Sequence, residues 1–315
     1  MRLLDFSLAH VEQAKHLIVI NYDEERAMVP ALPLVKELPD LVSFADKATG
    51  IAALDGDELL GFLCWDDPRD NYFGECKGTW SQIHAHGAVP KDRVYIYDRL
   101  YQTAAEKLTS DGVFCHSVTL YEHDIAASES FINNGFGRRC VDAVRLTAGT
   151  GIPPPRGVTC READIADAEE IANMNNALVR HLRGTPSFLY VPRAFTPDDI
   201  SKGILEGKYQ YYLALKENRP AAYIRLEKEG ENFITDDTSM MNISGAYALP
   251  EVRGKGIAAG LLSWLMDRLN RGGITRCGVD FECFNATARK FWLKYFTAYT
   301  NSVVRRVDER NFTNR

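Results

Sequence analysis

One feature limits the fold of this chain more than any other: a strand-like segment leads through glycines straight into a long amphipathic helix. The strand pattern ends at Ala246-Tyr247-Ala248, and Gly254 and Gly256 follow it. Beyond Gly256, apolar residues recur at helical spacing until Gly272-Gly273 ends the pattern. The sequence therefore predicts a helix over about 256–270, separated from a strand by little more than a glycine turn.

The start of that helix has the properties of an anion-binding site. A helix start exposes about four unpartnered N–H groups and carries a partial positive charge. Gly254 and Gly256 would let a phosphate approach the backbone, while Arg253 and Lys255 add positive charge. The pattern is neither a P-loop, since Lys255 precedes the last glycine, nor a GxGxxG fingerprint. We predict a pyrophosphate cradle here, with a plain structural turn and solvated cations as the alternative.

A proline-rich stretch near the middle of the chain predicts two domains. Pro153-Pro154-Pro155 can neither continue a helix nor pair in a central strand. With 315 residues, of which 45% are hydrophobic and 25% charged, each half can bury a core of its own. We therefore predict domains at 1–147 and 158–315, joined by a Pro/Gly linker at 148–157.

The order of predicted elements is similar in the two halves. For the second half the patterns predict strands at 158–161, 209–215, 221–226, 243–249, 274–283 and 300–307 and helices at 164–182, 256–270 and 285–296. For the first half they predict strands at 3–6, 50–54, 59–65, 81–87, 113–120 and 139–146 and helices at 10–21, 92–108 and 124–134. Hairpins followed by a βαβ unit indicate an α/β fold with a mixed sheet flanked by helices in each half.

Two motifs in the second half resemble those of the GNAT superfamily of acyl-CoA-dependent N-acyltransferases. Arg253-x-x-Gly256-x-Ala258 is similar to the family's Gln/Arg-x-x-Gly-x-Gly/Ala motif. Downstream, Asn285-x-x-Ala288-x-x-Phe291-Trp292-x-Lys294 resembles its Asn-x-x-Ala-x-x-Phe-Tyr-x-Lys helix. The interval between the motifs fits one helix, one strand and the next helix start. The resemblance covers residues 158–315 well and residues 1–147 only in outline, and it implies two tandem GNAT-like domains.

The resemblance implies acetyl-CoA as the co-substrate and assigns residues to it. It implies that the amides of Arg253, Gly254, Lys255, Gly256, Ile257 and Ala258 hold the pyrophosphate. It also implies that Ala246, Tyr247 and Ala248 pair with the pantetheine arm, with an amide near Ala248 polarising the thioester carbonyl. Asn285 would contact pantetheine or a cofactor hydroxyl, which is compatible with a helix-capping role.

The groups that perform the chemistry are less evident. The family's usual acid is a Tyr, but Trp292 stands at that position, and an indole N–H is not a useful acid. Tyr295 lies three residues further along the same helix face and is our candidate, with a packed aromatic as the alternative. Glu282, near the end of a strand, is the candidate base or amine-binding carboxylate, unless it is a solvated strand-end charge. We expect Cys283 to be a small packed thiol rather than a nucleophile.

The first half lacks the phosphate motif. Asp92 stands where a phosphate would bind and would repel it, so we predict a degenerate GNAT-like domain without CoA. It would shape the acceptor pocket or stand in for a second subunit. His84 and His86 would share a strand face, but no further ligand completes a metal site, and we predict no metal. Aromatic residues after the helix at 164–182, among them Phe188 and Tyr190, fall where the resemblance places the acceptor.

We predict an N-acyltransferase that moves an acetyl group from acetyl-CoA directly to an amine of a small molecule or peptide. The alternatives are a non-catalytic CoA-sensing module and aminoacyl transfer from tRNA. The net charge of −6 argues against nucleic acid as a partner. Seven cysteines without CxxC spacing, no signal peptide and no long apolar run predict a cytoplasmic protein with free thiols and no membrane contact, either monomeric or homodimeric.

Overall fold

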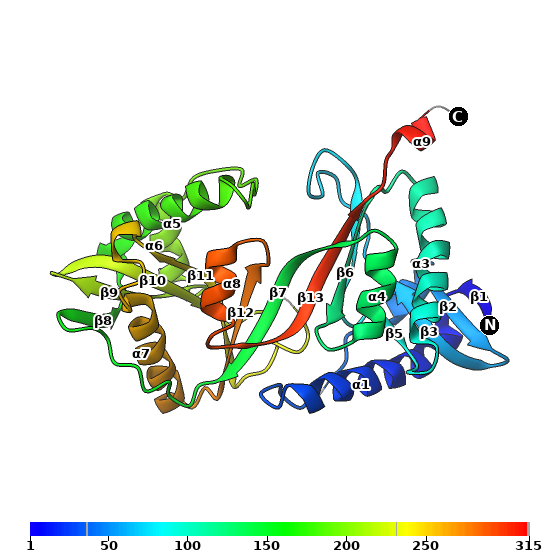
Figure 1. Ribbon diagram of the computed structural model, residues 1–315, viewed down its shortest axis with the longest axis horizontal. Coiled ribbons are helices and arrows are strands. Elements are labelled where there is room, and N and C mark those ends of the chain that lie inside the picture. Colours follow the sequence, from blue (N-terminus) through cyan, green and yellow to red (C-terminus); the bar gives the residue numbers. More distant parts are fainter. Residues whose placement is uncertain (36, 231, 314–315) are drawn as a thin grey trace. The chain divides into compact units, whose positions relative to one another are not determined.

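The computed structural model describes residues 1–35, 37–230 and 232–313, except the side chain of Thr313. The chain forms two compact units (Figure 1). Unit 1 consists of Met1–Asp142 together with Ala298–Arg315, and unit 2 of Ala143–Thr297. No disulfide joins any of the seven cysteines, all of which lie in the described ranges. No helix among the described residues is long and apolar enough to cross a membrane.

Unit 2 is built on a mixed sheet. Its strands are β8 (Val158–Glu162), β9 (Gln210–Lys216), β10 (Arg219–Glu227), β11 (Met240–Ala248), β12 (Arg276–Glu282) and the end of β7 (Gly137–Leu146). Their order is β7-β12-β11-β10-β9-β8. The pairs from β8 to β11 are antiparallel, whereas β11 and β12 are parallel. Its helices are α5 (Ala168–Arg183), α6 (Pro197–Leu205), α7 (Ile257–Arg271) and α8 (Ala286–Trp292).

Helices cover both faces of the antiparallel part of this sheet. Figure 1 shows α5 and α6 on one face and α7 on the other. Alternation along β9 explains the division: Tyr211 and Leu213 pack in the core beneath α5 and α6, whereas Tyr212 points the other way and meets Trp264 of α7. The predicted strand, glycine turn and amphipathic helix at 246–270 are therefore present, and Gly256 is the N-cap of α7.

The proline-rich segment packs against α7 within unit 2. The N–H of Ile152 donates to Ser263 Oγ at 3.2 Å. Gly260 permits the contact, because a Cβ there would stand 2.6 Å from Pro154 Cα. The segment that the sequence identified as a linker thus forms part of the covering of the helix that begins at the predicted phosphate cradle.

We expect Gly260→Ala to destabilise unit 2. Because the obstructing atom belongs to the backbone, relief needs a shift of the chain, and overpacking of this kind costs about 1–3 kcal/mol. The melting temperature should fall by roughly 2–4 °C for each kcal/mol. Gly137→Ala is the matched control, since a Cβ there meets nothing within 4 Å. Equal melting temperatures for the two variants would contradict the close packing of the proline segment.

Unit 1 contains two groups of strands. The first is antiparallel, in the order β1 (Arg2–Asp5), β2 (Gly50–Asp55), β3 (Glu58–Cys64) and β5 (His86–Ala88). The second has the order β4 (Gly78–Ser81), β6 (Cys115–Tyr121), β13 (Thr297–Arg306) and the start of β7. Its helices are α1 (Val11–Met28), α2 (Val42–Asp46), α3 (Arg93–Ser110), α4 (Ile125–Asn133) and the short α9 (Arg310–Thr313). A core cluster of this unit lies beneath α3 and α4.

The last strand of the chain belongs to unit 1. β13 pairs antiparallel with β6 over seven residues, from Thr300–Tyr121 to Arg306–Cys115. Conversely, β7 starts in unit 1 and ends in unit 2, where Thr147 N–H bonds to Thr275 O at 3.0 Å. The domain boundaries proposed from the sequence, 1–147 and 158–315, remain a prediction. The compact units differ from them in the place of this last strand.

Two local expectations were wrong. The strand predicted at 81–87 is divided into β4 and β5 by a turn in which Ala85 N–H donates to Gln82 O, so His84 and His86 share no strand face. The helix predicted at 285–296 ends at Trp292. Helix α6 was missed although Thr196, Pro197 and Asp199 form a capping box with Pro in the first turn.

Candidate functional site

The sheet of unit 2 opens between β11 and β12. Their parallel pairing joins residues 240–243 to residues 276–279, and no later pair joins the two strands in the described part of the chain. On its other edge, β11 remains paired with β10 as far as Ala248–Ala222. The register jumps from Ile243–Leu226 to Gly245–Arg225, so Ser244 forms a bulge where the separation begins. Residues 244–248 therefore line one side of a gap in the sheet.

Backbone groups of β11 face this gap. Leu249 N–H donates to Ala221 O on the β10 side at 3.0 Å. Because the bonding direction alternates along a strand, the N–H and C=O of Ala248 and Ala246 point to the opposite edge. The carbonyl of Ala248 accepts a bond from Arg253 Nε at 3.0 Å. An extended ligand in the gap could therefore pair with the remaining groups, as an added strand would.

The start of α7 carries backbone amides that are not used within the fold. Gly254 and Gly256 have φ values of +74° and +79°, which favour glycine. The N–H groups of Arg253 and Lys255 each donate to a loop carbonyl at 3.3 Å. Among the described residues, no backbone acceptor faces the remaining amides of this turn, those of Gly254, Gly256, Ile257 and Ala258. These four are placed to bind an anion.

The two cations predicted beside the cradle differ in their surroundings. The guanidinium of Arg253 turns back, binds Ala248 O and lies 5.2 Å from the centre of the Tyr247 ring. It therefore ties the loop to the end of β11. Lys255 is exposed beside the glycines. The structure thus brings Ala246–Ala248 and Gly254–Ala258 together through one short connection.

On the face covered by α5 and α6, an arginine adjoins the bulge. Arg225 Nε donates to Ser244 Oγ at 2.9 Å and Nη2 donates to Ser244 O at 2.7 Å. Its guanidinium lies 4.6 Å from the centre of the Tyr209 ring. The strand register aligns Tyr211, Arg225 and Gly245 across three strands, and the guanidinium lies over Gly245, where a Cβ would stand 3.4 Å from Arg225 Nε. No carboxylate among the described residues forms an ion pair with this half-buried arginine.

Arg225 was missed in the sequence, although a lone charge in the apolar run 221–226 is a usable signal. Two tyrosines share its face. Tyr223 OH donates to Asn175 Oδ1 at 2.9 Å, and burial raises the pKa of both Tyr211 and Tyr223. Both phenols therefore stay protonated near neutral pH and can donate hydrogen bonds but cannot serve as bases.

The other candidates lie at the ends of β12 and α8. Glu282 is the half-buried last residue of β12, and continuing the β11–β12 register places it opposite Ala246 across the gap. Asn285 caps α8 by accepting a bond from Ala288 N–H at 3.2 Å. Trp292 is 6% exposed and packs edge-on to Phe296, which makes it a core residue. Tyr295 is half-buried in the turn after α8, with its ring 5.2 Å from that of Phe291.

In unit 1 the corresponding strand edge is occupied. Val89 N–H donates to Leu60 O of β3, so Ala88 faces away from β3, as Ala248 faces away from β10. There the side chain of Asn21 binds both the N–H and the C=O of Ala88, each at 3.1 Å. Next to it, His86 Nε2 bonds Thr119 O of β6 at 2.7 Å. A ligand would find no unpaired backbone at Ala88.

The helix start of unit 1 is likewise filled. Asp92 is the left-handed N-cap of α3 with φ +56°, the position that Gly256 takes in α7. Arg93 follows it and is buried, with Glu24 at 2.8 Å and Asp124 at 3.0 Å from its Nη1. A phosphate here would meet carboxylates. No group of three or more His, Cys, Asp or Glu arranged for a metal occurs within residues 1–35, 37–230 and 232–313.

Comparison with known proteins agrees with this geometry. The model of the acetyltransferase (GNAT) family matches residues 176–296, which include the β11–β12 gap and the start of α7. A GCN5-related N-acetyltransferase from Sphaerobacter thermophilus aligns over 97% of this chain and 95% of its own, with 12% identity and a TM-score of 0.57. A glucosamine N-acetyltransferase region of a fungal multi-domain GH3 β-N-acetylglucosaminidase aligns over 96% of this chain and 38% of its own, with 13% identity and a TM-score of 0.53. No curated protein sequence matches.

The family match is confined to the unit in which the gap is open and the helix start is unfilled. The likeness to the two solved structures shows that the fold extends over both units. Residues 176–296 of unit 2 thus match the acetyltransferase (GNAT) family, and the chain as a whole has the fold of the solved GNAT protein.

Proposed function

We propose that the protein is an N-acetyltransferase that uses acetyl-CoA bound in unit 2 and transfers the acetyl group directly to an amine. The observation that carries the proposal is the continuity of the β11–β12 gap with the unpartnered amides of α7. The pyrophosphate would bind the N–H groups of Gly254, Gly256, Ile257 and Ala258. The pantetheine arm would pair with Ala246 and Ala248 in the gap.

The chain offers groups for each step of direct transfer. An amide that faces the gap near Ala248 would stabilise negative charge developing on the thioester oxygen. Glu282, opposite Ala246, would accept a proton from the acceptor's ammonium group, which leaves the neutral amine free to attack the thioester. Tyr295 would protonate the departing thiolate, because Trp292 is packed in the core and has no acidic proton. Asn285 is already engaged as the helix cap, and its second carbonyl lone pair and its NH2 would contact the arm.

The acceptor would approach on the face that holds Arg225 and Tyr211. A half-buried guanidinium without a carboxylate partner favours an anionic group in the ligand. We therefore propose that the acceptor amine carries a carboxylate or a similar anion. The exposed Phe188 and Tyr190, 72% and 86% exposed, would flank this face as part of the loop beyond α5.

The direct test is turnover. The protein is first melted with and without acetyl-CoA, and then incubated with acetyl-CoA and a panel of amino acids, amino sugars, aliphatic amines and short peptides. Free CoA and acetylated amine are measured by mass spectrometry. Binding with turnover supports the enzyme. Binding without turnover of any amine favours the non-catalytic CoA-binding module, for which the buried Trp292 argues. Absence of binding would overturn both.

We expect Glu282→Gln to lower kcat by about 100-fold or more at neutral pH, since the amide cannot accept the proton. Tyr295→Phe should lower kcat by a smaller factor, because a thiolate is a good leaving group even when it is not protonated. Neither change should alter the thermal shift produced by acetyl-CoA. Asp280→Asn, on the same face of β12 two residues earlier, is the matched control. An unchanged kcat for Glu282→Gln would remove Glu282 from the mechanism.

A further inference from the structure

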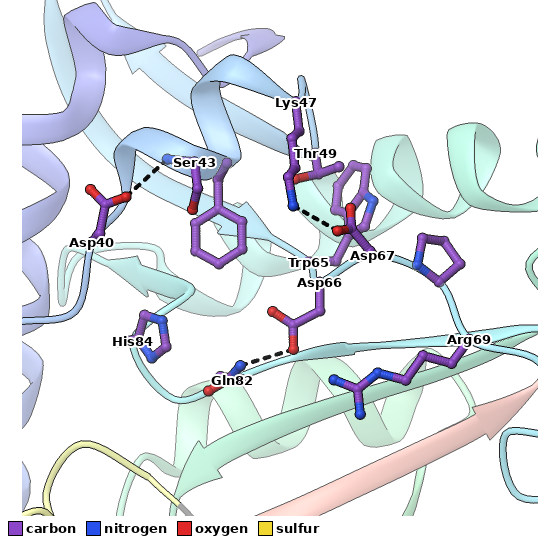
Figure 2. Close-up of a pocket in the computed structure, with 12 residues that line it drawn as sticks. Asp40, Ser43, Lys47, Thr49, Trp65, Asp66, Asp67, Arg69, Gln82 and His84 are labelled. Carbon is purple, nitrogen blue, oxygen red and sulfur yellow. Dashed lines mark hydrogen bonds and ion pairs between the residues drawn. The ribbon is translucent and has the colours of Figure 1, made fainter.

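A cavity in unit 1 is independent of the CoA gap and of the reaction proposed above. Its volume is about 490 Å3, within the range of small-molecule sites. Three segments line it: the region of α2 from Asp40 to Thr49, the chain after β3 from Trp65 to Arg69, and the turn with Gln82 and His84 that separates β4 from β5 (Figure 2). The irregular turn that interrupts the predicted strand therefore forms one of its walls.

Part of the lining is aromatic and uncharged. Phe44, Trp65 and His84 are all buried, and the rings of Phe44 and His84 lie 6.1 Å apart. Burial lowers the pKa of His84 to about 4, so its imidazole is neutral at physiological pH. The hydroxyl of Thr49 is buried in the same wall and has no hydrogen-bond partner within the described residues. Such a group is costly unless a ligand or water binds it.

Most of the charges around the cavity are satisfied. Lys47 Nζ pairs with Asp67 at 2.6 Å. Asp40, two residues before α2, accepts bonds from Val42 N–H and Ser43 N–H. Figure 2 shows both arrangements at the upper side of the cavity. These three charged residues therefore have partners of their own.

Two opposite charges have no such partner. Asp66 Oδ2 accepts one bond, from Gln82 Nε2 at 2.9 Å, and burial raises the pKa of this half-buried carboxyl. Arg69 extends along the lower side of the cavity (Figure 2). Among the described residues, neither side chain takes part in an ion pair. The backbone of Asp66 is fixed by bonds to Trp80 O and Thr79 Oγ1, which holds the carboxylate in place.

From this arrangement we propose that unit 1 binds a small zwitterion, an α-amino acid in the simplest case, with its ammonium on Asp66 and its carboxylate on Arg69. Phe44 and Trp65 pack against its side chain, and neutral His84 and Thr49 supply hydrogen bonds. Unit 1, in which Asn21 occupies the strand edge at Ala88, would thus have a ligand site of its own.

The experiment is calorimetric titration of the full chain, without acetyl-CoA, with glycine, leucine and phenylalanine. Leucine is compared with 3-methylbutylamine, which lacks its carboxylate, and with 4-methylpentanoate, which lacks its amine. We expect at least one amino acid to bind, and the partial analogues of leucine to bind about tenfold or more weakly than leucine itself wherever leucine is a ligand. Absence of binding by all three amino acids at 10 mM would overturn the proposal.

Variants locate the site. Asp66→Asn and Arg69→Gln should each weaken binding by about tenfold or more. Asp67→Asn is the matched control, because the carboxylate of Asp67 forms an ion pair with Lys47. This variant should change the affinity for the amino acid by less than about twofold. Arg225→Met must leave the binding intact, which separates this site from the acceptor face of unit 2. If Asp66→Asn binds the amino acid as tightly as the native protein does, the proposed site is wrong, whatever the result of the acetyltransferase assays.

Discussion

Ala258→Glu is expected to abolish acetyl-CoA binding while leaving the fold intact. Ala258 is the second residue of α7 and is half-buried beside the unpartnered amides. A carboxylate there would stand close to the bound phosphates. Like charges about 4 Å apart near a surface repel by roughly 4 kcal/mol, which is enough to lower the affinity for acetyl-CoA more than about 100-fold. In the free protein an acidic residue in the first helical turn is mildly stabilising.

The measurement is the melting temperature with and without acetyl-CoA. A ligand at about 100 times its Kd adds roughly 2.7 kcal/mol to the state that binds it, which corresponds to several degrees. The native protein should show this shift and Ala258→Glu should not. Ala126→Glu, at the second residue of α4, is the matched control and should keep the shift. Gly256 is less suited to such a test, because its φ of +79° would strain any side chain. A retained shift in Ala258→Glu would mean that the phosphates bind elsewhere.

The second large effect is expected at Arg225. Arg225→Met keeps the length of the side chain but removes the charge and the bonds to the Ser244 bulge. For acceptors with a carboxylate, kcat/KM should fall about 100-fold, mainly through KM, since losing one partner of a partly buried pair costs about 2–5 kcal/mol. For the matching methyl esters or amides the change should be small.

Arg225→Lys separates charge from geometry. Lysine keeps the positive charge but cannot make the paired bonds of a guanidinium, so we expect it to restore only part of the activity. The thermal shift with acetyl-CoA should be the same in all three proteins. If Arg225→Met lowers the activity on acids and on esters equally, the arginine only supports the bulge and does not select the acceptor.

The sequence predicted what depends on neighbouring residues. The segment 246–270 reads as strand, turn and helix because its periodicity and its glycines are local, and the structure has all three. Asn285 as a helix cap is equally local. Arg225 was not predicted as a site residue because its position in the site depends on the bulge at Ser244. That bulge forms only when β10 pairs with β11.

The sequence indicated only one of the two features that fill the corresponding site in unit 1. The sequence predicted that the carboxylate of Asp92 would repel a phosphate, and Asp92 is the N-cap residue of α3. The more effective obstruction is Asn21, which satisfies Ala88 from 67 residues away in the sequence. Nothing in the residues around Ala88 indicates that its edge is taken. Likewise, no pattern in residues 297–306 shows which unit that strand will join.

The place of this last strand has a consequence for biosynthesis. Unit 1 contains residues 1–142, yet one of its internal strands, β13, leaves the ribosome only after the whole of unit 2. During translation, the edge of β6 that pairs with β13 therefore stays uncovered while roughly 180 further residues are added, for about 9–36 s at ordinary rates of synthesis. Unit 1 therefore cannot complete its fold before unit 2 has been synthesised, although most of unit 1 is translated first.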